Sequence, residues 1–135
     1  MERSLFIIKP DAVQRNLIGR IISYMESAGL EVVGMRMVHM TPEIAAGFYK
    51  VHEGKEFYDK LVEYMSSGKS VVVVLEGEDA INRIRKVCGA TDPSKADEGT
   101  IRATFGMNIT MNSVHASDSA RSAEQEVPYF FPDLR

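Results

Sequence analysis

An uninterrupted apolar run at residues 71–75 constrains the fold most strongly. Four valines and a leucine in succession, without polar alternation, are typical of a strand that is apolar on both faces. A second apolar run, at residues 5–8, is closed by Lys9 and Pro10, and proline ends a strand because it cannot donate to the ladder. We therefore expect Lys9 at the carboxyl end of a buried strand, where open sheets place ligands.

The other elements follow from periodicity and from residues that start or stop helices. Asn16 is a candidate N-cap for an amphipathic helix at 18–25, which Gly29 closes. Thr41 and Pro42 start another helix. The predicted order is a strand at 5–8, a helix at 18–25, a strand at 30–40, a helical hairpin within 41–65, a strand at 71–75, a helix at 80–88, an irregular stretch at 90–111, a strand carrying His115, a helix at 119–126 and a short tail.

This order predicts an α+β fold with a single domain over residues 1–135. Four strands with two interleaved crossovers fit a ferredoxin-like βαββαβ sandwich, with a four-stranded antiparallel sheet, an added helical hairpin and a long loop before the last strand. Alternation over 30–40 places Val33, Met35 and Met37 on one face, and His39 continues this inward face as a packing or hydrogen-bonding residue. Such a core serves many unrelated functions and does not decide the chemistry.

Composition excludes several classes of partner. A formal net charge of -3 argues against general nucleic-acid binding. The single cysteine, Cys88, cannot form an intramolecular disulfide, and its helical spacing from Ile84 predicts a buried thiol. The apolar run after Met1 is too short for a signal peptide, and no stretch approaches the roughly 20 apolar residues of a membrane span. We therefore expect a cytoplasmic protein without a membrane partner.

Gly68, Lys69 and Ser70 imitate the end of a P-loop. That motif needs a glycine five residues before its last one, where this chain has Glu63. It must also follow a strand and open a helix, whereas here the segment follows a predicted helix and opens a strand. We therefore reject the P-loop interpretation.

Residues 112–119, with the sequence Asn-Ser-Val-His-Ala-Ser-Asp-Ser, present His115 among hydroxyl and carboxylate groups. A histidine titrates near neutral pH, and nearby acceptors can fix its tautomer, so it can serve as a nucleophile. A lone histidine near the end of a strand is more often structural or solvated. The functional interpretation therefore depends on residues elsewhere in the chain.

Other residues could form a phosphate site if the fold brings them together. The candidates are Lys9, Arg85 and Arg102 as cations, Thr91 and Asn112 as neutral donors, and Phe57 and Leu61 as an apolar clamp for a flat base. Each has an ordinary alternative, such as surface charge for the arginines and core packing for Phe57. Spacing alone does not decide between these interpretations.

Five ordered segments, at residues 8–11, 57–65, 89–93, 99–102 and 112–119, carry a family resemblance. The last is similar to the pattern Asn-x-x-His-Gly-Ser-Asp, the active-site signature of nucleoside diphosphate kinases. Over essentially its whole length the chain resembles the short bacterial members of that family.

The resemblance implies a kinase that works by a ping-pong mechanism. His115 would attack the γ-phosphate of a nucleoside triphosphate, mainly ATP, carry the phosphoryl group on Nδ1 as phosphohistidine, and pass it to a nucleoside diphosphate. Glu126 would keep the other ring nitrogen protonated, and Tyr49 and Ser117 would lie near the histidine. The implied nucleotide-binding residues are Lys9, Phe57, Leu61, Arg85, Thr91, Arg102 and Asn112.

The resemblance also implies a cofactor and an assembly. Mg²⁺ would bridge the phosphates, held mainly by the nucleotide because few protein ligands are evident. Stacking on one face of the base predicts broad base specificity. Family members assemble as hexamers or tetramers, and we expect a hexamer.

The chain departs from the family pattern at three places. Ala116 replaces the usual glycine after the histidine, and if this position needs a positive φ, the methyl group would cost roughly 1 kcal/mol or more. Residues 55–58 replace a more usual Arg-Pro-Phe-Phe, and residues 69–70 stand where a proline is common.

Two other functions compete with the kinase. A non-catalytic nucleotide-binding regulatory module would keep the cations but would not need His115 and Glu126 together. A histidine phosphocarrier fed by another protein would not need Phe57 or the clustered cations.

Overall fold

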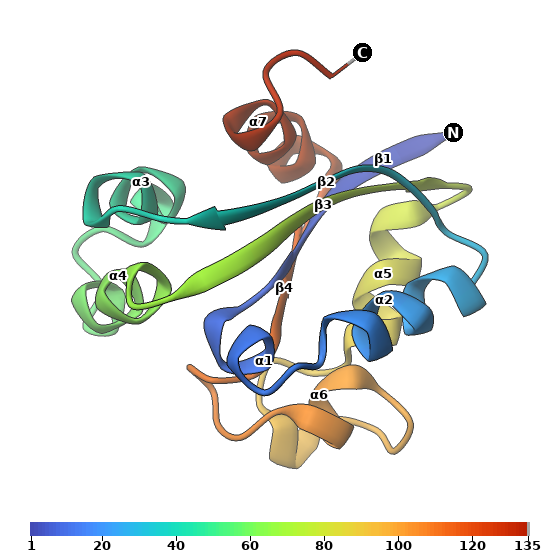
Figure 1. The fold of residues 1–135 in the computed structure, drawn as a ribbon, viewed down its shortest axis with the longest axis horizontal. Coiled ribbons are helices and arrows are strands. Elements are labelled where there is room, and N and C mark those ends of the chain that lie inside the picture. The colour runs from blue at the N-terminus through green and yellow to red at the C-terminus, as the bar shows by residue number, and fades with distance from the viewer. Residues whose placement is uncertain (135) are drawn as a thin grey trace.

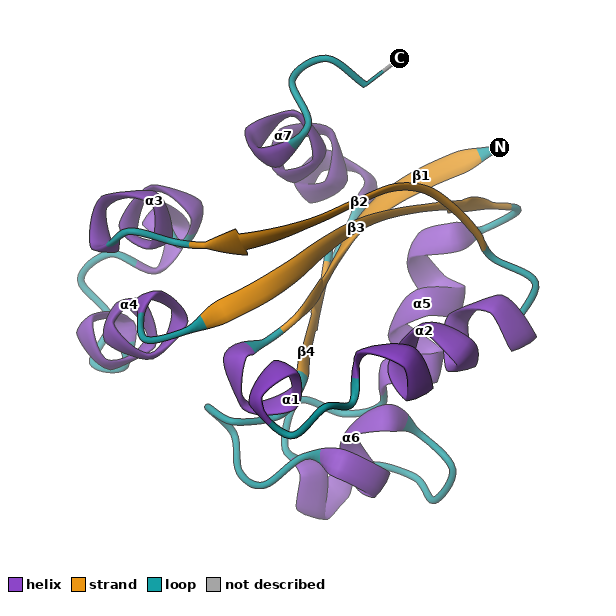
Figure 2. Cartoon of the chain, viewed as in Figure 1, coloured by secondary structure: helices purple, strands orange, loops and turns teal. Residues whose placement is uncertain are grey.

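The computed structural model describes residues 1–134 (Figure 1). Each strand is followed by one or more helices (Figure 2). The elements, in order, are β1 (Glu2–Ile8), α1 (Pro10–Gln14), α2 (Ile18–Ser27), β2 (Glu31–His39), α3 (Pro42–Phe48), the 3-10 helix η1 (Lys50–His52), α4 (Tyr58–Ser66), β3 (Lys69–Gly77), α5 (Ala80–Cys88), the 3-10 helix η2 (Pro93–Lys95), α6 (Ile101–Phe105), β4 (Val114–Ala116) and α7 (Ala120–Phe130). None of the helices within residues 1–134 has the length and apolar character needed to cross a bilayer.

The four strands form one sheet in the order β2-β3-β1-β4, and each neighbouring pair is antiparallel. β1 pairs with β3 on one side and with β4 on the other, so Ile7 stands opposite both Val72 and His115. The predicted α+β fold with a four-stranded antiparallel sheet is confirmed. Its topology places the histidine strand directly beside β1, whose last five residues are buried.

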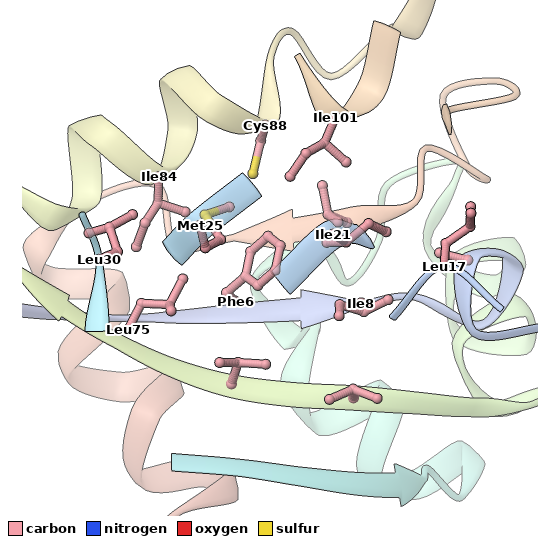
Figure 3. Close-up of a cluster of buried hydrophobic side chains, with 14 of the residues drawn as sticks. Phe6, Ile8, Leu17, Ile21, Met25, Leu30, Leu75, Ile84, Cys88 and Ile101 are labelled. Carbon is pink, nitrogen blue, oxygen red and sulfur yellow. The ribbon is translucent and has the colours of Figure 1, made fainter. Parts of the chain in front are cut away.

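Helices cover both faces of the sheet because the central strands alternate their side chains between two apolar clusters. Val71 and Val73 pack in the first cluster with residues of α1, α2, α5 and α6, including the buried Cys88 (Figure 3). Val72 and Val74 pack in the second cluster with residues of α3, α4 and α7. The burial predicted for residues 71–75 and for Cys88 is therefore confirmed.

The predicted inward face of residues 30–40 is wrong. A β-bulge between Val32 and Gly34 inserts Val33, which packs in the second cluster. The extra residue reverses the alternation, so Met35 and Met37 share the other face, where their side chains are 55% and 51% exposed. β2 is an edge strand, and its end leads into α3 (Figure 1).

His39 at the end of β2 is exposed instead of inward-facing. Its Nε2 lies 3.0 Å from the main-chain oxygen of Ser66 at the end of α4. The predicted hydrogen-bonding role of His39 is thus confirmed, whereas its inward position is not.

Asn16 does not cap a helix. α2 begins one residue later than such a cap requires, with Leu17 at the N-cap position, and Asn16 adopts a φ of 60° in the turn after α1. Asparagine tolerates the left-handed region because its short polar side chain bonds locally, which suits this tight turn.

Two short helices were not predicted, and one helix is longer than expected. α1 and α6 have five residues each, too few for a periodic pattern. α6 lies within the stretch expected to be irregular, and the Thr100 hydroxyl caps it by accepting from the Ala103 N–H at 3.3 Å. α7 continues past Pro128 to Phe130, because the buried Phe130 and Phe131 pack its last turn in the second cluster.

Candidate active site

A cavity of about 460 Å³ opens between β4, the 49–61 segment and the long 89–112 connection. Its lining residues are Lys9, Tyr49, His52, Phe57, Leu61, Arg85, Thr91, Arg102, Ile109, Thr110, Asn112, His115, Ala116 and Asp118. Nine of the eleven predicted site residues thus converge on one cavity, and the other two, Ser117 and Glu126, lie behind the histidine. A larger hollow of about 760 Å³ against residues 107–111 contains no predicted site residue.

His115 is held by a carboxylate on one side of its ring. Its Nε2 lies 3.0 Å from Oε1 of Glu126, which reaches it from α7. The carboxylate can only accept, so Nε2 carries the proton and Nδ1 keeps its lone pair. The rings of Phe48 and Tyr49 meet the imidazole edge-on, with centroids 5.2 and 6.0 Å away. These contacts fix the orientation of the ring, and the lone pair on Nδ1 can act as a nucleophile.

Ser117 ties the same carboxylate to the sheet. Its Oγ donates to Oε1 of Glu126 at 2.8 Å and accepts from the Leu5 N–H of β1 at 3.2 Å. Glu126 is therefore positioned by the central sheet as well as by its own helix.

Lys9 is the first residue after β1, and it is only 6% exposed. Its ammonium donates to Oδ1 of Asn112 at 2.9 Å, and the amide of Asn112 donates in turn to the Thr91 carbonyl at 3.0 Å. Burial, followed by repulsion from Arg102, lowers the pKa of Lys9 to about 8. The charged lysine is thus poorly compensated by the protein alone.

Arg102 projects from α6 and joins two walls of the cavity. Its guanidinium donates to the carbonyls of Gly89 and Val114, both at 2.8 Å. Its Nε is buried and finds no hydrogen-bond partner within residues 1–134, and the same holds for the buried hydroxyl of Tyr49. Burial lowers the pKa of Arg102 and raises that of Tyr49. Unsatisfied donors beside buried cations are arranged to receive an anion.

Two apolar side chains, Phe57 and Leu61, also line the cavity and form its apolar rim. Phe57 precedes α4 with its side chain 48% exposed, and Leu61 follows one turn later. The His52 ring lies 5.3 Å from the Phe57 ring, and the Lys55 ammonium lies 5.8 Å above it. An exposed aromatic face of this kind can stack against a flat ring.

The sequence model of the nucleoside diphosphate kinase family matches residues 2–135. The chain belongs to this family. It is 49% identical to a nucleoside diphosphate kinase of Persephonella marina over 134 residues, covering 99% of this chain and 96% of the relative.

Solved structures of other family members agree. The nucleoside diphosphate kinase of Aquifex aeolicus is 43% identical, with a TM-score of 0.96 over 98% of this chain and 96% of that one. A halophilic member from Halobacterium salinarum, solved in complex with CDP, is 40% identical, with a TM-score of 0.95 over 98% of this chain and 88% of that one. The protein is therefore an enzyme that transfers phosphate between nucleotides, and the non-catalytic alternative is not favoured.

Ala116, which replaces the usual glycine of this kinase family, fits its position. It belongs to β4 and pairs with Phe6 of β1, and it is not among the residues of positive φ within 1–134. The left-handed residue of this segment is Ser113, with a φ of 77°. The methyl group of Ala116 therefore causes none of the backbone strain considered from the sequence.

Sequence reasoning missed three polar residues that line the cavity of this kinase: His52, Thr110 and Asp118. His52 follows Tyr49 by three residues, a helical spacing that could have placed both on one side of the chain. Asp118 lies inside the signature segment itself. Thr110 stands in a loop without periodicity, so no sequence signal was available for it.

Proposed function

We propose that the enzyme transfers phosphate by a ping-pong mechanism in which His115 carries the phosphoryl group on Nδ1. The observation that carries the proposal is that His115, held by Glu126, lines a cavity that also holds Lys9, Arg85 and Arg102. Nδ1 forms a bond to the γ-phosphorus while the bond from phosphorus to the bridging oxygen breaks, and the nucleoside diphosphate leaves. The reverse step on a second diphosphate regenerates the free histidine.

The cavity's cations supply most of the catalysis in this proposal. Phosphoryl transfer passes through a loose transition state with negative charge on the transferring oxygens, so fixed positive groups and in-line positioning lower its energy. Lys9 and the free Nε of Arg102 would bind these oxygens together with the Tyr49 hydroxyl. Arg85, Thr91 and Asn112 would bind the remaining phosphates and the sugar.

Phe57 and Leu61 would hold the base. The rim that they form offers an apolar face, which every base can stack against. Recognition by stacking predicts activity with purine and pyrimidine nucleotides alike.

Mg²⁺ is the cofactor in this proposal. Residues 1–134 contain no group of three or more His, Cys, Asp or Glu side chains that could form a metal site, and Asp118 is the one carboxylate lining the cavity. This donor set fits an ion held mainly by phosphate oxygens. When bound, Mg²⁺ would neutralise phosphate charge, while Lys9 and Arg102 orient the γ-phosphate.

We further propose that the chain forms a homo-oligomer, a hexamer in preference to a tetramer, in the cytoplasm. The exposed Met35 and Met37 on an edge strand support association, since apolar groups at a sheet edge favour contacts with another chain. Sedimentation equilibrium distinguishes six from four copies of the 15.1 kDa chain.

The decisive experiment incubates the protein with γ-labelled ATP and Mg²⁺ in the absence of an acceptor. We expect an acid-labile label on the wild-type protein, which a chase with unlabelled GDP releases as labelled GTP. His115→Ala should take up no label. His39→Ala is the matched control, because His39 is exposed and outside the cavity, and it should label as the wild type does. Labelling of His115→Ala, or an unlabelled wild type that still binds ATP, would contradict the proposal.

A further inference from the structure

A buried carboxylate that does not line the cavity is not used by the proposed chemistry. Asp11 lies in α1, two residues after Lys9, and is 6% exposed. Its Oδ1 accepts from the hydroxyl of Tyr64, and its Oδ2 accepts from Oγ of Ser113 at 3.2 Å. The main-chain N–H of Asp11 donates to the same Tyr64 oxygen at 2.8 Å. The carboxylate thus joins α1, α4 and the segment before β4.

Ser113 is the second component of this arrangement. Its φ of 77° lies in the left-handed region, which a non-glycine residue adopts only at a cost in free energy. Its carbonyl accepts from the Lys9 N–H at 2.9 Å, and its hydroxyl is held by Asp11. This turn places the neighbouring Asn112, whose Oδ1 meets the Lys9 ammonium. Asp11 therefore links the two backbone segments that carry the lysine–asparagine contact, the start of α1 after Lys9 and the turn at Ser113 after Asn112.

Asp11 also acts on the charge of Lys9. Burial and the Arg102 guanidinium lower the pKa of Lys9 to about 8, and the Asp11 carboxylate opposes them by raising it. The charged groups that act on the pKa of Lys9 are Arg102 of α6 and Asp11 of α1, and the shared cavity also holds Tyr49, His52, Arg85, His115 and Asp118. Asp11 is the negative group that counts most for the lysine among these.

We propose that Asp11 is a positioning residue for Lys9: through Ser113 it fixes the turn that brings Asn112 to the lysine ammonium, and its buried carboxylate supplies negative charge to the surroundings of that ammonium. The inference rests on the proposed function, in which Lys9 binds phosphate oxygens. Its consequence is that Lys9 stays positively charged at neutral pH in spite of its burial.

The test is an NMR titration of the free protein with lysine labelled with carbon-13 at Cε, with the Lys9 signal assigned from Lys9→Arg. In Asp11→Asn the side chain keeps its shape and can still accept from Tyr64, but its charge is gone. We expect Lys9 to lose its proton at a lower pH than in the wild type, because an attractive charge has been removed. The alkaline limb of kcat/KM, which reports the free enzyme, should move by the same amount.

Tyr64→Phe is the matched control, because it removes a partner of Asp11 and keeps the charge. It should lower the unfolding temperature and leave the Lys9 titration in place. If Asp11→Asn lowers stability but leaves the Lys9 titration unmoved, Asp11 is only structural and the proposal is overturned.

A measurement on the wild type does not depend on the variants folding. The Asp11 carboxyl-carbon signal should show an inflection at the pH where Lys9 titrates, and its absence would also overturn the proposal. A shifted Lys9 titration in a protein that forms no phosphoenzyme would support the Asp11–Lys9 coupling while refuting the proposed function.

Discussion

Ser117 and His115 meet at the same oxygen of Glu126: Oγ of Ser117 lies 2.8 Å from Oε1, and Nε2 of His115 lies 3.0 Å from it. The serine is in turn bonded to β1 through the Leu5 N–H. The Glu126 carboxylate is therefore held in place by the central sheet, and it in turn fixes the orientation of the imidazole. A group that acts in this way affects the rate through orientation and proton position more than through nucleotide affinity.

Glu126→Gln is expected to slow phosphorylation of His115 by about 10²-fold, because the amide no longer stabilises the charge that develops on the imidazole. Ser117→Ala should slow it by about 5-fold, the worth of one hydrogen bond of about 1 kcal/mol. Single-turnover labelling with γ-labelled ATP measures both rates. A Glu126→Gln variant that labels at the wild-type rate but binds ATP weakly would contradict this role.

Arg102→Lys is expected to lower both the free energy of unfolding and the affinity for nucleotide. Lysine cannot reach the Gly89 and Val114 carbonyls together, so at least one buried acceptor is left unsatisfied, at a cost of about 1–3 kcal/mol. Urea unfolding and calorimetric ADP titration provide the two measurements. Arg85→Lys is the control, since the exposed Arg85 should leave the unfolding midpoint unchanged. Equal stability of the two variants would exclude a structural role for Arg102.

Phe57→Ala should reduce the affinity for all nucleoside diphosphates by a similar factor. Stacking on an aromatic side chain is worth about 1–3 kcal/mol per base, which corresponds to about 5- to 150-fold. Binding of ADP, GDP, CDP and UDP is the measurement, with Val51→Ala as a control at a neighbouring, 78% exposed residue. A loss confined to purine nucleotides would show that the rim does more than stack.

Ala116→Gly, which restores the family's usual residue, is expected to destabilise the protein by about 0.5–1 kcal/mol without raising the rate. Glycine loses more conformational entropy on folding, and the extended backbone in β4 gives it no strain to relieve. Chemical denaturation and steady-state kinetics test the two parts. A faster enzyme would mean that the methyl group obstructs the nucleotide.

The sheet was predictable from the sequence because burial leaves a direct trace in it. The valine run of β3 and the apolar run of β1 needed no knowledge of the rest of the chain. The bulge at Val33 left no such trace, since inserting one residue changes the faces of Met35 and Met37 without changing composition. α1 and α6 are too short to show a period, and they are stabilised by packing against the first cluster.

The site was predictable only as a set of residues. Family motifs selected Lys9, Arg102 and His115, but whether they meet depends on pairing between β1 and β4, which lie more than 100 residues apart. The Asp11–Ser113 contact spans a similar separation and belongs to no local pattern. Such contacts are set by the closed fold, which is why they emerge only with the structure.

His115 has one unprotonated ring nitrogen and lines one cavity. Any base can stack against the apolar rim of this cavity. Under the proposed mechanism, donor and acceptor nucleotides must then bind in the same cavity one after the other. The cavity therefore cannot select one of them and reject the other. At equilibrium the fraction of chains that carry phosphate would rise with the ratio of nucleoside triphosphates to nucleoside diphosphates, taken over all bases. The phosphorylated fraction of His115 would thus report the ratio of nucleoside triphosphates to diphosphates in the cell.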